Sequence, residues 1–278
     1  MLGAIIGDIV GSRFEFVEDQ MRPKDFALFT SACTPTDDSF MTLAVAKALL
    51  FAKGDEARLG KLAVSCMCEV AHAHPKTGWG GRFYKWLFHE RNPQPYNSCG
   101  NGAGMRISPV GWVAETEEEL KRLAKTVTEV SHNHPEGLKG AEAIALGVFL
   151  ARTGKTKQEI RLRLQEYYPI LKDEDFSIAS LHGNYGYDDF GNWVTCQGSV
   201  PQAIVAFLDS ESFEDAIRNA VCIGGDSDTI GAMAGAIAEA YYGVSLEMED
   251  IALGYLSEDL KSIYLAFHAI KRKRTPRV

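Results

Sequence analysis

The chain has 278 residues, 46% of them apolar, and a formal net charge of −8. This length can bury a large core, as one domain or two small ones, and the acidic balance disfavours general nucleic-acid binding. No run of eighteen apolar residues occurs, so no membrane span is expected. The start of the chain lacks a basic segment and the six cysteines are scattered, which favours a cytoplasmic protein with reduced thiols.

Helical patterns dominate from the first residues onwards. The sequence predicts helices over residues 36–53, 116–132, 137–152, 156–168, 201–208, 212–220, 228–242 and 257–273. Gly54 ends the first of these, and capping boxes open two others at Thr116 and Thr156. Alternating strands and hairpin signals are missing from the sequence. We therefore predict an all-α fold with a single compact multi-helix domain over residues 1–278, including a short basic tail at 271–278.

Glycines within a helical pattern indicate where the backbone of a neighbouring helix can pack closely. Gly231 and Gly235 lie four residues apart in the 228–242 pattern, a spacing that permits close approach of a neighbouring backbone, so this helix should be central. Long loops are expected near residues 73–112 and 173–200. Loops of this length in a compact domain are usually functional.

Two short acidic strings stand out, Thr-Asp-Asp-Ser at residues 36–39 and Asp-Ser-Asp-Thr at residues 226–229. Each combines two carboxylates with a hydroxyl and precedes an Ala-rich helical pattern. Oxygen donors without sulfur or imidazole suit hard cations such as Mg²⁺ or Mn²⁺. The alternative is a pair of acidic helix N-caps. A third acidic element, from Gly7 to Glu15, favours the shared metal site.

Four motifs in order resemble the ADP-ribosylglycohydrolase family, which includes the dinitrogenase reductase-activating glycohydrolases. The motifs are Gly7 to Glu15, Thr36-Asp37-Asp38, Gly100 to Arg106, and Gly224 to Thr229. The resemblance covers residues 3–243 and implies an all-α fold of the ADP-ribosylglycohydrolase type. It also implies a dinuclear metal cleft that holds two divalent cations, Mg²⁺ or Mn²⁺.

The resemblance assigns roles to individual residues. The implied metal ligands are Thr36, Asp37, Asp38, Asp226, Asp228 and Thr229. The implied catalytic acids are Glu15, beside the metals, and Asp38. The implied substrate-binding residues are Gly80, Gly81, Gly100, Asn101, Gly102, Met105 and His132. Glycines let backbone N–H groups approach phosphate oxygens closely. The aromatic residues of the loop at 184–191 are candidates for stacking on adenine.

Together these features predict a metal-dependent hydrolase. It would cleave the glycosidic bond between ADP-ribose and an acceptor, either a protein side chain or another ADP-ribosylated molecule, and release ADP-ribose. Its partners would be the ADP-ribosylated substrate and the product ADP-ribose. Two alternatives stay open: a non-catalytic member that binds ADP-ribose or a nucleotide, and a metallo-phosphohydrolase that acts on nucleotide diphosphates. The acceptor is not identified by the sequence.

Overall fold

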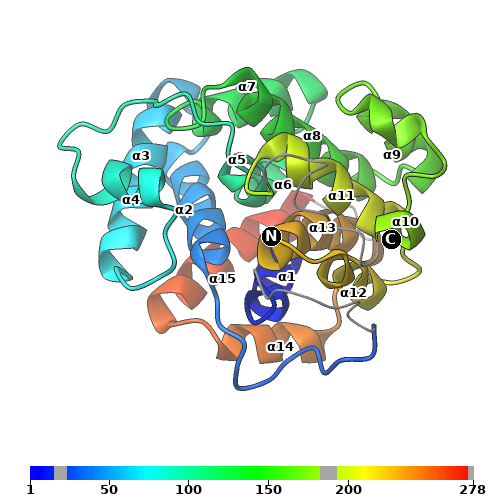
Figure 1. Cartoon of the computed structure of the whole chain (residues 1–278). Helices are drawn as coiled ribbons and strands as arrows, with labels where there is room; N and C mark the ends of the chain where they lie inside the picture. The colour runs from blue at the N-terminus through cyan, green and yellow to red at the C-terminus, as the bar shows by residue number, and fades with distance from the viewer. Residues whose placement is uncertain (16–23, 182–192, 275–278) are drawn as a thin grey trace.

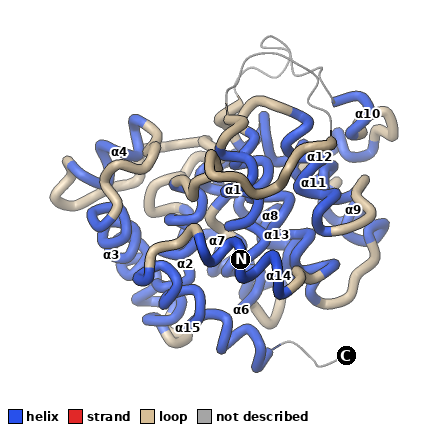
Figure 2. The backbone as a smooth tube through the Cα atoms, turned by 90° about the horizontal axis from the view of Figure 1, so that it is seen from below, coloured by secondary structure: helices blue, strands red, loops and turns tan. Residues whose placement is uncertain are grey.

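The computed structural model describes residues 1–15, 24–181 and 193–274, and within these ranges the regular structure is helical, without a strand (Figures 1 and 2). In chain order the helices are α1 (Leu2–Ser12), α2 (Asp37–Ala52), α3 (Glu56–Ala73), α4 (Gly81–Phe88), α5 (Gly102–Met105), α6 (Ser108–Val113), α7 (Glu117–Thr128), α8 (Pro135–Arg152), α9 (Lys157–Leu164), the 3-10 helix η1 (Pro169–Lys172), α10 (Ile178–Leu181), α11 (Cys196–Leu208), α12 (Phe213–Ile223), α13 (Ser227–Tyr242), α14 (Leu246–Gly254) and α15 (Glu258–Arg274). The predicted all-α class is confirmed. None of the described helices is both long enough and apolar enough to cross a lipid bilayer.

Helices α1 and α13, from opposite ends of the chain, pack against each other at the centre of the fold (Figure 1). Their backbones touch through glycines on both sides. A Cβ atom on Gly7 would lie 2.0 Å from the carbonyl oxygen of Gly231, and one on Gly3 would lie 2.0 Å from that of Gly235. No side chain fits in this space. The predicted central position of the 228–242 helix is therefore confirmed.

Around this pair, α2, α8, α11 and α12 complete the buried core. α8 contacts α13, α7 and α6, and α2 contacts both α1 and α3. α2 and α13 are predominantly buried along their lengths, which explains why their sequences are apolar on most faces rather than amphipathic. The N-termini of these two central helices carry the acidic strings.

Most predicted helices occur near their expected bounds, but some assignments were wrong. α11 begins at Cys196 rather than at Pro201, because Thr195 caps the helix by accepting a hydrogen bond from Gly198 N. The loop expected at 73–112 contains α4, α5 and α6, and the one at 173–200 contains α10 and the start of α11. Helices α3 and α14 were not predicted from the sequence. Their N-cap residues, Asp55 and Ser245, are of the types that commonly begin helices.

The glycine contact gives a test of the packing. Replacing Gly7 by alanine should lower the free energy of unfolding by about 2 kcal/mol or more, because the new methyl group would overlap the backbone of α13. The control is Gly254→Ala in α14, where a Cβ would meet no atom within 4 Å and should leave stability equal or slightly higher. Urea unfolding of both variants measures the difference. Equal stability of Gly7→Ala and the parent chain would contradict this packing.

Candidate functional site

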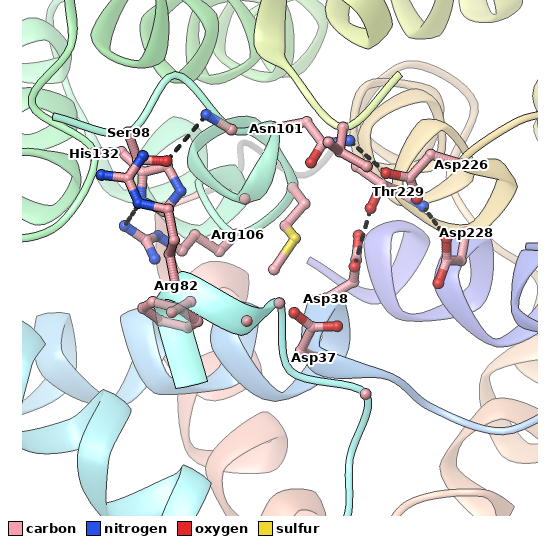
Figure 3. A pocket seen from close by; sticks show the side chains of 18 of the residues that line it. Asp37, Asp38, Arg82, Ser98, Asn101, Arg106, His132, Asp226, Asp228 and Thr229 are labelled. Atoms are coloured by element: carbon pink, nitrogen blue, oxygen red, sulfur yellow. Dashed lines mark hydrogen bonds between the residues drawn. The ribbon is translucent and has the colours of Figure 1, made fainter. Parts of the chain in front are cut away.

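A cavity of about 420 Å³ opens where the N-termini of α2 and α13 meet the start of α4 and the short helix α5 (Figure 3). The predicted site residues that line it are Glu15, Asp37, Asp38, Gly80, Gly81, Gly100, Asn101, Gly102, Met105, His132, Asp226, Asp228 and Thr229. Thr36 instead lines a neighbouring cavity, where it caps α2. The fold thus gathers residues from six separate segments around one space.

The two acidic strings meet through a hydrogen bond between residues that lie 191 positions apart in the sequence. The Thr229 hydroxyl donates to Asp38 Oδ2 over 3.2 Å, and the Thr36 hydroxyl lies 3.4 Å from Asp228 Oδ2. Each string begins a helix, so its carboxylates face the positive end of a helix dipole.

Helix capping does not account for the second string. The Asp226 side chain makes no capping hydrogen bond to α13, and instead its Oδ2 accepts a hydrogen bond of 2.7 Å from Asn101 Nδ2. Thr36 is a true N-cap, because its hydroxyl accepts from Asp38 N. The first string therefore serves both roles, whereas Asp226 is directed into the cavity (Figure 3).

Asp8 on α1 organises the first string and was given no role by the sequence. Its fully buried carboxylate accepts hydrogen bonds from Thr36 N (2.9 Å), Thr36 Oγ1 (2.6 Å), Ser39 N (3.1 Å) and Ser39 Oγ. Burial raises the pKa of Asp8 to about 6, and these hydrogen bonds oppose the rise. The sequence does contain a signal for this role, because Asp8 is the acid within the otherwise apolar, glycine-containing pattern of the first helix.

The acids form two overlapping groups of oxygen donors. Oxygen atoms of Asp8, Asp38 and Asp228 lie within 4.8 Å of one another, and so do those of Glu15, Asp226 and Asp228. Asp228 belongs to both groups. Asp37 belongs to neither, but it lines the same cavity.

Within residues 1–15, 24–181 and 193–274, this end of the cavity has no ion-paired positive charge. None of the described lysines and arginines forms an ion pair with these acids. Burial and the neighbouring carboxylates raise the pKa values of Asp37, Asp38 and Asp228 well above the ordinary range. Asp38 Oδ1 is buried without a hydrogen-bond partner. Such a donor set fits hard divalent cations.

Glu15 lies at the rim, where it is exposed, in the turn that follows α1. Desolvation, followed by the charges of Asp226 and Asp8, raises the pKa of Glu15 to about 7. A carboxyl group with a pKa near neutrality can exchange protons with water at physiological pH. Glu15 is therefore the acid best placed to meet a ligand that enters the cavity.

The opposite end of the cavity is formed by glycines and basic or aromatic side chains. A Cβ atom on Gly80 or Gly81 would meet nothing within 4 Å, so these glycines border open space. The turn at residues 100–102 is held in place by Asn101 N, which donates to Val194 O over 2.9 Å. Arg82 and Arg106 line this end (Figure 3). The aromatic loop at 184–191 lies outside the described residues.

A family model described as ADP-ribosylglycohydrolase matches residues 1–255 of the chain. The chain belongs to this family. The predicted family and its class of hydrolase acting on glycosidic bonds are thereby confirmed. The match includes all of the motifs that carry the acids of the cavity.

Named relatives agree with this membership. The chain is 25% identical to ADP-ribosylhydrolase ARH3 of Homo sapiens, over 88% of this chain and 84% of the relative. It is 28% identical to ADP-ribosylarginine hydrolase Tri1 of Pseudomonas putida, over 88% of this chain and 70% of the relative. A solved structure titled ADP-ribosylglycohydrolase-related protein complex shares the fold, with a TM-score of 0.66, 23% identity and 97% coverage of both chains.

The raised pKa values of this ADP-ribosylglycohydrolase family member predict how its stability depends on pH. The folded acids hold protons that the unfolded chain has already released, so the free energy of unfolding of cation-free protein should fall as the pH rises from about 4 to about 7. Mg²⁺ or Mn²⁺ should therefore raise the melting temperature more at pH 8 than at pH 5.5.

Thermal unfolding with EDTA and with each cation, at both pH values, measures this effect. Asp38→Asn removes one charge from the cluster and should reduce the response to cations. Glu90→Ala is the matched control, because Glu90 is an exposed acid of the loop that follows α4. A melting temperature that stays unchanged at pH 8 after addition of either cation would contradict a metal site here.

Proposed function

We propose that this protein is a divalent-cation-dependent hydrolase that cleaves the glycosidic bond between ADP-ribose and an acceptor and releases ADP-ribose. The observation that carries the proposal is the division of the cavity into two ends. One end collects carboxylates that pair with none of the described lysines or arginines, and the other presents glycines, arginines and a histidine. An ADP-ribosyl group has matching parts, because its ribose hydroxyls can share cations with carboxylates and its diphosphate is anionic.

The proposed holders of two cations are Thr36, Asp37, Asp38, Asp226, Asp228 and Thr229, with Asp228 shared between the two groups of donors. Mg²⁺ or Mn²⁺ held by these residues would supply Lewis-acid contacts that orient the ribose hydroxyls. Asp8 holds the backbone and hydroxyl of Thr36, so it keeps the first acidic string in position. The family membership and the names of the ARH3 and Tri1 relatives support this assignment.

Glu15 is the proposed general base and acid. Its carboxylate, which nearby cations would keep ionised, would take a proton from the water that attacks C1 of the distal ribose. As the bond between C1 and the acceptor breaks through an oxocarbenium-like state, the same group can return the proton to the leaving acceptor. Asp38 is only 2% exposed and accepts from Thr229, so we assign it a charge-stabilising role instead.

The glycine-lined end is proposed to bind the diphosphate and the ribose next to it. Gly80 and Gly81 leave open space at the N-terminus of α4, where backbone N–H groups are free of helical partners. Gly100, Asn101 and Gly102 form the opposite wall, together with Met105 and His132. Binding energy from these parts of the substrate would orient C1 against the acids.

The central test is the identity of the product. Incubation with α-ADP-ribosylated arginine, serine and nucleic-acid ends should yield free ADP-ribose from at least one linkage, and EDTA should abolish the release. Asp37→Ala and Asp228→Ala should each lower the turnover by more than about 100-fold, whereas Glu90→Ala should not. Release of AMP would indicate a phosphohydrolase, and tight ADP-ribose binding without any release would indicate a binding protein.

Glu15→Gln separates chemistry from binding. The amide keeps the size of the side chain but cannot accept a proton, so kcat should fall by about 10² to 10⁴. The Kd for ADP-ribose should change only a few-fold, because Glu15 lies at the rim. Single-turnover kinetics and calorimetry measure the two quantities. A Glu15→Gln variant with the parent kcat would assign the proton transfer to another residue.

A further inference from the structure

Arg106 is a buried guanidinium that forms no ion pair with a carboxylate of the described residues. The residue is 1% exposed, and neither Nε nor Nη1 has a hydrogen-bond partner. Its contacts are the Ser131 hydroxyl at 2.7 Å, His132 Nδ1 at 3.3 Å and the ring of Phe83, whose centroid lies 5.5 Å from Cζ. Burying a cation without a counter-charge costs free energy. Because a guanidinium only donates hydrogen bonds, its neighbours must act as acceptors, and this fixes where their own hydrogens lie.

The contacts of Arg106 define the protonation state of His132. A guanidinium has only donors, so its contact with Nδ1 is attractive only if Nδ1 carries a lone pair. Ser131 Oγ lies 2.8 Å from the same nitrogen and accepts from Arg106, which leaves its own hydrogen free to point at Nδ1. Nδ1 therefore acts as an acceptor, and the ring proton lies on Nε2.

The Nε2 edge of His132 faces the glycine turn and the cavity. A Cβ atom added to Gly102 would lie 3.2 Å from Nε2, and one added to Gly100 would lie 3.4 Å from it. Both glycines thus keep this edge uncovered. His132 lines the cavity, and within the described ranges no hydrogen bond to Nε2 occurs. Figure 3 shows His132 and Arg106 at the end of the cavity away from Asp228.

The surroundings of the ring keep His132 neutral. The groups that face it are the cations of Arg106 and Arg82 and the aromatic rings of Phe83 and Tyr96. Burial, followed by the charges of Arg106 and Arg82, lowers the pKa of His132 well below its ordinary value. A neutral imidazole with a single available proton is a directional donor.

We propose that Arg106 is a positioning residue, which holds His132 as its Nε2–H tautomer so that His132 donates a hydrogen bond to a phosphate oxygen of the ligand. A charged acceptor suits this donor, because the positive charge of Arg106 lies behind the ring and Arg82 lies at the same end of the cavity. The choice of phosphate rests on the proposed ADP-ribose function. The tautomer does not depend on that function.

The first experiment observes the wild-type protein directly. Long-range ¹H–¹⁵N spectra of histidine side chains should show His132 with Nδ1 unprotonated and Nε2 protonated, unchanged between pH 5 and pH 8. The exposed ring of His89 provides an internal comparison. An Nδ1–H tautomer, or a ring that takes up a proton within this pH range, would overturn the proposal even if no variant can be made.

The second experiment tests how Arg106 acts on binding. Arg106→Lys keeps the charge but removes the planar fork, so His132 should sample both tautomers and ADP-ribose should bind about 10-fold more weakly. Arg82→Lys is the matched control, which should leave the tautomer unchanged. His132→Gln places an amide donor near the position of Nε2, and on this background Arg106→Lys should cost less than about 3-fold.

Two results separate the possible failures. Weaker ADP-ribose binding by Arg106→Lys with an unchanged His132 tautomer would overturn the positioning role. If ADP-ribose binds neither variant nor the parent chain, but the wild-type spectrum shows Nε2–H, the positioning role is supported and the proposed ligand is wrong.

Discussion

The backbone contact between α1 and α13 determines where the acids of the cavity can lie. Glycines on both helices bring the carbonyl of Gly231 within reach of Gly7, and Gly11 lies against the backbone at Asp228. This close approach places Asp8, one residue beyond Gly7, beside the start of α13. The oxygens of Asp8 and Asp228 then lie within 4.8 Å of each other and of Asp38. A larger residue at Gly7 would separate these helices and with them the donor groups.

The second constraint is electrostatic. Several buried carboxylates share a small space, and mutual repulsion together with burial makes their ionised forms costly. Two helix N-termini reduce this cost, and so do the hydroxyls of Thr36, Ser39 and Thr229, but none of them brings a full positive charge. This excess of negative charge is the feature of the site that the proposed divalent cations would compensate.

The two ends of the cavity carry side chains of opposite charge. Among the described residues, the acids at one end form no ion pair with a lysine or arginine, and at the other end Arg106 is buried with Nε and Nη1 unbonded. The proposed ligand would meet both ends, with its ribose hydroxyls at the acids and its diphosphate at the arginines. Asn101 connects them, because its backbone holds the glycine turn and its amide donates to Asp226. A shift of this turn would change both ends at once.

Local signals in the sequence were sufficient to predict most of the helices, since caps such as Thr116 and Thr156 act within a few residues. The acidic strings and the motif order also predicted the family and many of the residues that line the cavity, whereas Thr36 lines a neighbouring cavity and Arg82 and Arg106 were not predicted as site residues. The role of Asp8 and the pairing of Arg106 with His132 depended on tertiary structure, because both require side chains far apart in sequence to meet after packing. Burial decides their partners and protonation states, and burial follows from the contact of α1 with α13.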